Sequence, residues 1–422
     1  MEHALTFVKV AAVFAAVVVA RKRKAPMGLA LGGGGLAIAL LMGRTPAWIA
    51  RELAGGLDAV LFSPSTCQFV AVIGCTIGLS TVLERAGQIE RLTNAFRACF
   101  ASPRVTLVAL PAIIGFLPMP GGALFSAPMV EAAATGTGLD KQDKTLINYW
   151  FRHVWEYAWP LYPGVMITSQ LLGIEVRWVS LAQAPMCVAA ILAGLVFLRG
   201  AGPAAAPREA APRGRAALDA AIVLLPFAVI VGVHLAAGLS IVLATGAGLA
   251  LAAVWHAAAR HVGTGALLRS LFASRAVLGM LVMAYGAKVF GELMVRSGAI
   301  AGIAALLQSM SLPLLLLAVA LPFCVAFFSG ITIVYVMTTF PVLIATTGTG
   351  AQAMPVIALA YAAGYCGTLL SPVHSCFVVS TAYWQSEIVV SMRRLLIPCA
   401  IVLATGAALM LVLRSWVLGS GS

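Results

Sequence analysis

Long apolar runs follow one another along nearly the whole chain, and this pattern constrains the fold more than any other feature of the sequence. Of the 422 residues, 61% are hydrophobic and only 10% are charged, whereas soluble domains carry roughly 25% charged residues. A helix needs about 20 apolar residues to cross a bilayer, and no polar stretch is long enough to form an attached soluble domain. The sequence predicts an all-α polytopic membrane protein with about ten transmembrane helices.

Basic residues give the chain a formal net charge of +13, which in a soluble protein would suggest nucleic-acid binding. Here they lie in short loops between apolar runs, as in cytoplasmic loops of membrane proteins, so we expect no nucleic-acid partner. The apolar run Ala4–Ala20 precedes the basic residues 21–24, which is the reverse of the order in a signal peptide. We expect a first span that ends in the cytoplasm, and we set aside 419–422 as a Gly-Ser cloning remnant.

An internal duplication organises the chain. The segment 110–138 reappears as 321–350, and matched glycine, proline and glutamate spacings continue on both sides of it. Between the two copies lies a stretch rich in Pro, Ala and Arg that is typical of a linker. We therefore predict a first repeat at 1–198, a cytoplasmic linker at 199–216 and a second repeat at 217–418.

Basic loops in one repeat are matched by neutral segments in the other. The loop Lys141–Lys144 corresponds to Ala351–Met354, and the neutral segment 297–313 corresponds to the basic segment 85–104. Because cytoplasmic loops are enriched in Lys and Arg, the two repeats should have opposite orientations in the membrane. Inverted repeats of this kind are typical of secondary transporters.

Each repeat also contains a segment with two apolar arms, each too short to cross the bilayer, and one spanning helix that is interrupted. We predict re-entrant hairpins at 105–135 and 313–347 and broken helices at 146–178 and 352–385. Non-helical backbone at membrane depth is tolerated only where protein buries it or where it lines a wet cavity. Free helix ends there can hold ions or anionic groups. The four breaks are expected at Pro118–Gly122, Pro160–Gly164, Ser329–Gly330 and Gly367–His374.

Ionisable residues inside the membrane are costly, at about 2.5–3.5 kcal/mol on insertion scales, and the first broken helix carries several. Arg152 and Glu156 are four residues apart, so we expect them to pair on one helical face. This pair is either a structural lock or part of an anion site, because a guanidinium matches a carboxylate in a bidentate geometry. In the second broken helix the hydroxyls suit sodium, whereas His374 suits a proton or an anion.

Other polar or small residues are interpreted as structural. Glu131, Lys288 and Glu292 are expected to form structural pairs or to lie at the membrane interface. No CxxC pair occurs among the eight cysteines, so no disulfide framework or zinc site is indicated, and Cys366 and Cys376 are interpreted as small apolar fillers. The run Gly32–Gly35 lies inside an apolar span and follows no strand, so it predicts close helix packing rather than a phosphate loop.

Three strings of the sequence, LPMPGGALFSAPM, NYWFRHVWEYAWPLYPG and GYCGTLLSPVHSCFV, resemble a bacterial integral-membrane family, domain-of-unknown-function 401. The family that the strings resemble is grouped within the ion-transporter superfamily, which includes divalent-anion/sodium symporters, gluconate permeases and some sodium/proton antiporters. The resemblance covers essentially the whole chain. It implies a homodimer in the bacterial cell (inner) membrane that works by an elevator motion, with hairpin tips at Pro118–Gly122 and Ser329–Thr332. The chain lacks the Ser-Asn-Thr signatures of dicarboxylate members, which argues against that specificity.

The function that we predict is secondary active transport of a small organic anion, coupled to sodium or protons, with a sodium/proton antiporter as the alternative. The sequence has no GxSxG or HExxH motif, so an enzyme is not expected, and no cofactor is indicated. A channel would more typically show pore symmetry among chains. We expect the dimer interface near 4–43 and 218–257. The candidate substrate-binding residues are Met119, Pro120, Gly121, Gly122, Arg152, His153, Glu156, Ser329, Gly330, Thr332, Thr368, Ser371 and His374.

Overall fold

The computed structural model describes residues 2–23, 25–55, 59–100, 102–116, 122–202, 213–258, 275–309, 313–372 and 374–419, and every regular element in these ranges is helical. The first half contains α1 (Glu2–Lys22), α2 (Met27–Leu41), α3 (Pro46–Ala54), α4 (Pro64–Arg85), α5 (Gln88–Cys99), α6 (Pro103–Ile114), α7 (Ala123–Ala133), α8 (Lys141–Arg152), α9 (Pro163–Leu172), α10 (Val176–Gly194) and a short 3₁₀ turn, η1 (Leu195–Leu198). The second half contains α11 (Arg213–Val231), a π-helical turn η2 (Gly232–Ala236), α12 (Ile241–Ala258), α14 (Arg275–Arg296), α15 (Ala299–Ser309), α16 (Leu314–Ser329), α17 (Thr332–Thr347), η3 (Gly350–Gln352), α18 (Met354–Leu370), α19 (Ser375–Trp384) and α20 (Ile388–Gly419).

Several helices are long and apolar enough to cross a membrane. Within the described residues five segments qualify by length and composition: Thr66–Glu84, Val176–Leu198, Gly214–Ala236, Met354–Trp384 and Ile388–Ser415. Shorter apolar helices accompany them, and large apolar side chains are exposed on the outside of the molecule, such as Leu192 at 60% and Leu411 at 61%. A lipid environment explains this exposure, which a soluble protein would avoid. The chain is a multi-pass membrane protein, and the total of about ten crossings stays a prediction.

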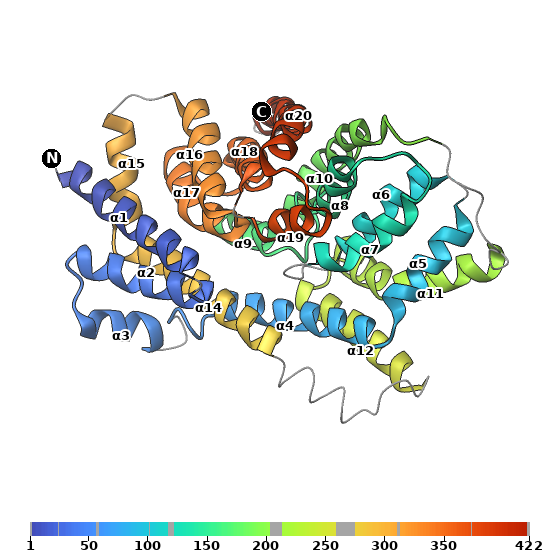
Figure 1. Ribbon diagram of the computed structural model, residues 1–422. Helices are drawn as coiled ribbons and strands as arrows, with labels where there is room; N and C mark the ends of the chain where they lie inside the picture. Colours follow the sequence, from blue (N-terminus) through green and yellow to red (C-terminus); the bar gives the residue numbers. More distant parts are fainter. Residues whose placement is uncertain are drawn as a thin grey trace.

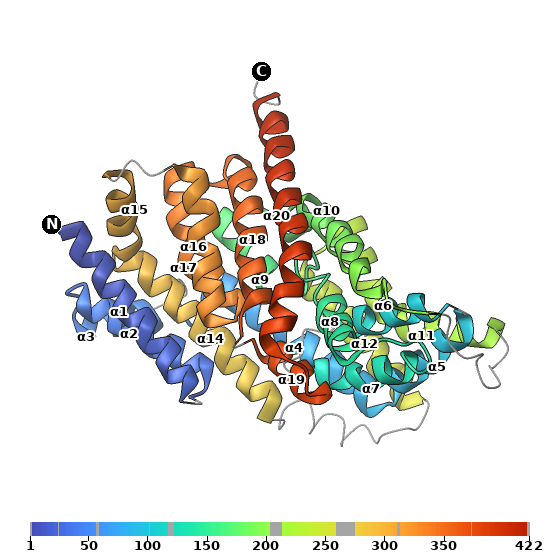
Figure 2. The same ribbon diagram turned by 45° about the horizontal axis from the view of Figure 1, so that its top comes forward.

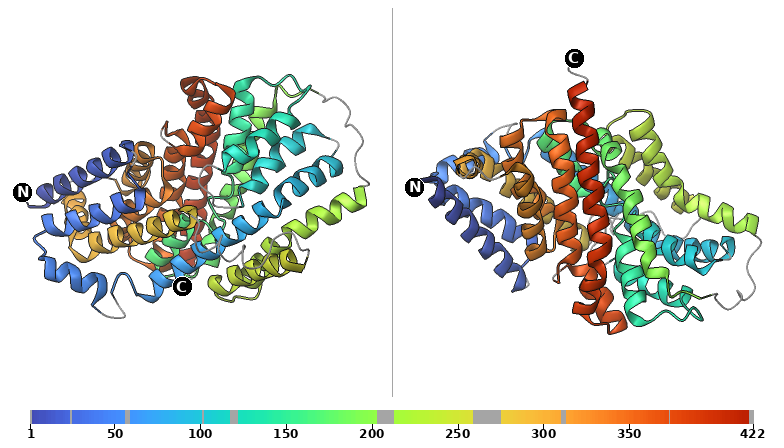
Figure 3. Two further views of the ribbon diagram at one scale, coloured as in Figure 1. Left: turned by 60° about the horizontal axis from the view of Figure 1, so that its bottom comes forward. Right: turned by 90° about the horizontal axis from the view of Figure 1, so that it is seen from above.

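The helices follow the same order in the two halves. The run α4–α10 consists of a long helix, a short helix, two consecutive helices, an interrupted pair and a final helix, and the run α14–α20 repeats this order. Figures 1 and 2 show α1–α3 with α15 at one end of the molecule and α5 with α11 at the other. In Figure 3 the helices α16–α20 and α8–α10 lie between these ends.

The first helices of each half pack against helices of the other half. Helix α2 packs against α14 and α1 against α15, while α12 packs against α4 and α11 against α5. At the α2–α14 contact a Cβ added to Gly35 would lie 2.8 Å from the Phe290 Cα. The interpretation of Gly32–Gly35 as a surface for close helix packing is therefore confirmed. An ion pair between Arg91 and Asp219 joins α5 to α11.

The interrupted spans break at places that differ in part from the prediction. Helix α8 already ends at Arg152, and irregular backbone runs from 153 to 162 before α9 begins at Pro163. The break therefore starts before Pro160, the first residue of the predicted break. It ends at Pro163, which begins α9, because a proline is well tolerated in the first turn of a helix. In the second half α18 continues to Leu370 and α19 begins at Ser375, so the break starts later than the predicted Gly367.

Candidate functional site

Hairpin tips and helix breaks from both halves meet in one buried region. At the end of the first tip, a Cβ on Gly122 would overlap the Arg152 guanidinium, so this side chain lies directly against the Gly122 backbone. At the second tip, a Cβ on Gly330 would lie 2.9 Å from the His374 amide nitrogen. Gly330 has a φ of +68°, a left-handed conformation that glycine adopts without strain. Gly122 and Gly330 therefore both pack against residues of the interrupted spans.

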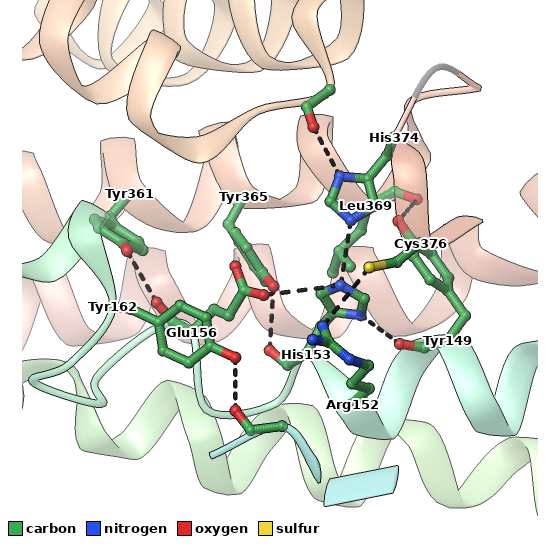
Figure 4. Close-up of polar contacts among 12 residues, drawn as sticks. Tyr149, Arg152, His153, Glu156, Tyr162, Tyr361, Tyr365, Leu369, His374 and Cys376 are labelled. Atoms are coloured by element: carbon green, nitrogen blue, oxygen red, sulfur yellow. Dashed lines mark hydrogen bonds and ion pairs between the residues drawn. The ribbon is translucent and has the colours of Figure 1, made fainter. Parts of the chain in front are cut away.

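Two histidines, one from each half, form the centre of this region. His153 is the residue after α8 and is 1% exposed, while His374 precedes α19 and is half-buried. Their Nε2 atoms are 3.2 Å apart. Figure 4 shows the two rings directed toward each other. The Nδ1 atom of His153 lies 2.5 Å from the Tyr149 carbonyl oxygen, and that of His374 lies 2.7 Å from the Gly330 carbonyl oxygen. Each ring is thus oriented by a backbone carbonyl.

Arg152 lies beside the histidines and is 2% exposed. Its Nη1 atom is 3.6 Å from Cys376 Sγ, whereas the carboxylate of Glu156 faces His153, with Oε1 3.7 Å from Nε2. The expected i,i+4 pairing of Arg152 with Glu156 is wrong, because α8 ends at Arg152 and the two residues do not share a helical face. The buried guanidinium is directed toward the first hairpin tip and α19.

Tyrosines of α18 donate hydrogen bonds to carbonyl oxygens of the irregular segment 153–162, which lies between α8 and α9. The Tyr361 hydroxyl donates to the Glu156 carbonyl at 2.9 Å, and the Tyr365 hydroxyl donates to the His153 carbonyl at 3.2 Å. On the other side of the break the Tyr162 hydroxyl donates to the Gly115 carbonyl at 2.6 Å. Unpaired carbonyls are costly at membrane depth, so these bonds stabilise the irregular backbone of the site.

Replacing Tyr365 by phenylalanine should destabilise the folded protein by about 0.5–1.5 kcal/mol, the net contribution of one hydrogen bond, because the His153 carbonyl still accepts from the Glu156 amide at 3.3 Å. The matched control is Tyr157→Phe, because the two rings pack edge to face with centroids 4.6 Å apart. Within the described residues the buried Tyr157 hydroxyl has no hydrogen-bond partner. We expect Tyr157→Phe to be neutral or stabilising when unfolding is followed in detergent. Equal destabilisation by both substitutions would contradict this account of the break.

The remaining predicted site residues are distributed around the two breaks. Gly330, Ser371 and His374 adjoin one another, since the Ser371 Oγ atom is 3.1 Å from an added Gly330 Cβ. Ser329 is the last residue of α16, and its hydroxyl accepts from the Ile331 amide at 3.4 Å. Thr332 begins α17 beside Gly164, the latter in the first turn of α9. Thr368 is buried within α18 and donates to the Gly364 carbonyl at 3.3 Å. Met119, Pro120 and Gly121 lie outside the described residues.

Two contributors to the site were missed by the sequence reasoning. Cys376 is not a filler: its Sγ lies within 4.8 Å of a ring nitrogen of both His153 and His374, and it is 4% exposed. Its position two residues after His374 is the signal that could have indicated this. Asn148 was also overlooked, although it donates to the Ala123 carbonyl at 3.0 Å and to the Ser380 hydroxyl at 2.9 Å, joining the first hairpin to α19.

The residues interpreted as structural pairs do form pairs away from this site. Lys288 contacts Glu292 at 3.4 Å and donates to Gln170 Oε1 at 3.1 Å. Glu131 accepts from Lys144 at 2.8 Å and from Trp384 Nε1 at 2.6 Å. Cys366 behaves as the expected buried filler, with its thiol donating to the Cys399 carbonyl at 3.3 Å.

Comparison with known proteins shows a family that the chain matches and a solved structure that it resembles. The family described as "Protein of unknown function (DUF401)" matches residues 6–413. Among solved structures, one described as "Crystal structure of the Alcanivorax borkumensis YdaH transporter reveals an unusual topology" is 16% identical, with 88% of each chain covered and a TM-score of 0.47. No curated protein matches the sequence.

Proposed function

We propose that this chain, which belongs to the DUF401 family, is a secondary active transporter of a small organic anion driven by a sodium or proton gradient. The observation that supports this function best is the position of Arg152. This buried guanidinium lies against the first hairpin tip, at the meeting of breaks from both halves of the chain. A cation held at such a break is suited to binding a carboxylate group, which it can contact through two parallel hydrogen bonds.

The proposal includes two repeats of inverted topology. It is supported by the matched helix order of α4–α10 and α14–α20 and by the reciprocal packing of α2 on α14 and α12 on α4. Helices α6 and α7 would form one re-entrant hairpin and α16 and α17 the other. Inverted repeats place the substrate site near the bilayer midplane, where the interrupted helices meet. In a bacterial cell the inner membrane is the expected location.

Inverted topology places Lys141 and Ala351, which occupy matched positions at the starts of the two interrupted spans, on opposite sides of the membrane. Single cysteines at these positions, in a background without the native cysteines, should react with a membrane-impermeant maleimide from opposite sides. Lys141 should label only from the cytoplasmic side, since its loop is basic and the Ala351 loop is neutral. Labelling of both positions from one side would overturn the inverted repeat.

An elevator-type motion is proposed for alternating access. The hairpins and interrupted spans would move together, while α1, α2, α11 and α12 would form the static part and the homodimer interface. None of these four helices carries an interruption comparable to 153–162. A protein that stays monomeric both in mild detergent and in lipid nanodiscs would contradict the dimer.

The experiment that tests the function is uptake into proteoliposomes. Purified protein is reconstituted, sodium and pH gradients are imposed separately, and a panel of radiolabelled small carboxylates is offered. The proposal predicts concentrative uptake of at least one carboxylate under one of the two gradients. Sodium flux coupled to proton flux without any carboxylate would instead identify the antiporter, and passive flux without coupling would identify a channel.

A further inference from the structure

The orientation of the two central histidines determines which ring nitrogens are available. A backbone carbonyl can only accept a hydrogen bond, so each Nδ1, at 2.5 Å and 2.7 Å from its carbonyl, must carry the N–H group. In the neutral rings the lone pairs are therefore on the Nε2 atoms, which are 3.2 Å apart and face each other (Figure 4). Two lone pairs at this distance repel each other unless a cation lies between them.

A third donor atom completes the arrangement. Cys376 Sγ and the two ring nitrogens all lie within 4.8 Å of one another. Cys376 and His153 are almost fully buried, whereas His374 is half-buried. Glu156 adds a carboxylate oxygen 3.7 Å from His153 Nε2.

We propose that His153, His374 and Cys376 form a binding site for a transition-metal dication of the zinc class, with Glu156 next to its fourth position. Imidazole and thiolate are the ligands that zinc prefers, at about 2.0–2.1 Å and about 2.3 Å. Two nitrogens bound tetrahedrally at these lengths are about 3.3 Å apart, close to the 3.2 Å between the Nε2 atoms. Carbonyl groups that fix the rings through Nδ1 are the usual outer partners of metal-binding histidines.

The charges around the cluster are compatible with a bound dication. Arg152, 3.6 Å from Cys376 Sγ, favours the thiolate form that binds metal. The thiolate and the Glu156 carboxylate together outweigh the guanidinium, so a dication leaves a single net positive charge in the cluster. The ligands come from both halves of the chain, and the ion would therefore link the end of α8 to the start of α19.

A single proton shared by the two Nε2 atoms would also relieve their repulsion, but it would give the thiol no role. The nearby sulfur favours a metal ion because thiolate selects soft and borderline metals. The shared proton is the other outcome of the test.

Co²⁺ is the probe that separates the two outcomes. The full chain, purified without a polyhistidine tag in detergent under reducing conditions, is titrated with Co²⁺ alone. The proposal predicts visible absorption of tetrahedral Co²⁺ together with a near-ultraviolet sulfur-to-cobalt charge-transfer band, and Zn²⁺ should displace both. The Cys376→Ser variant should lose the sulfur band. His374→Ala should weaken binding by more than the roughly 10–100-fold that loss of an outer-shell partner costs.

The matched control is Cys366→Ser, a buried cysteine on α18 that lies outside the cluster. It should keep the full cobalt spectrum, and far-ultraviolet circular dichroism of all variants shows whether they fold. A wild-type protein that shows no sulfur band, or a band that survives Cys376→Ser, would overturn the site. This measurement requires no transport, so its result is independent of whether the chain moves an anion.

Discussion

Uptake of the transported carboxylate should fall by roughly 30-fold or more when Arg152 is replaced by glutamine. Removing one partner of a buried charged pair costs about 2–5 kcal/mol, and each 1.4 kcal/mol corresponds to about tenfold in binding. The guanidinium is 2% exposed and lies against the Gly122 backbone. Few water molecules can therefore replace it as a partner for a bound anion. The measurement is initial uptake in proteoliposomes as a function of carboxylate concentration.

Charge and shape can be separated with a second variant. Arg152→Lys keeps the positive charge but cannot form two parallel hydrogen bonds with a carboxylate, so it should raise the half-saturating concentration more than it lowers the maximal rate. Arg394→Gln is the matched control, since Arg394 pairs with Asp143 at 2.7 Å on the half-exposed start of α20. This control should retain uptake.

A structural role for Arg152 gives a different result. In the double variant Arg152→Gln with Glu156→Met, both charges are removed together, which limits the cost of an uncompensated buried charge. If Arg152 only balances the charge of Glu156, the double variant should fold and transport normally. A folded double variant with normal uptake would therefore refute the anion-binding role, whereas a folded and inactive one supports it.

The sequence was sufficient to place two helix boundaries at the breaks, because proline and glycine act locally. Gly330 ends α16 in a left-handed conformation, and Pro163 begins α9. The predicted proximity of Arg152 to the first tip agrees with its contact at Gly122, although Met119–Gly121 lie outside the described residues. Local reasoning failed for the end of α8, where no proline or glycine signals that the helix stops at Arg152.

Contacts between the halves were beyond such reasoning. His153 and His374 are 221 positions apart in the chain, yet their rings meet because the interrupted spans of the two halves pack together. Cys376 was interpreted from its neighbours in the sequence, and His153 is not among them. The role of the α18 tyrosines that donate to the segment 153–162 could not be predicted either, since a buried aromatic residue in an apolar helix usually indicates packing. The site therefore depends on contacts between segments far apart in the chain, which residue type alone does not reveal.

The contact between the second hairpin tip and the second break should be essential for transport, and Gly330→Ala tests this contact. An alanine with left-handed backbone costs about 1–2 kcal/mol wherever it occurs. At Gly330 the added Cβ would also lie 2.9 Å from the His374 amide nitrogen and 3.1 Å from Ser371 Oγ. It would therefore push the tip away from the break and move His374, whose Nδ1 is held by the Gly330 carbonyl at 2.7 Å.

Gly350 provides the control for backbone strain, because its φ is +71° and an added Cβ there would meet nothing within 4 Å. Gly350→Ala should lose about 1–2 kcal/mol of stability and keep its uptake rate per folded molecule. Gly330→Ala should show at least the same loss of stability and, in addition, a loss of most uptake, because the tip can no longer close on the break. Thermal unfolding in detergent and initial uptake rates normalised to folded protein separate the two effects. Equal uptake by the two variants would show that the tip does not need to contact the break, and would remove the second hairpin from the proposed site.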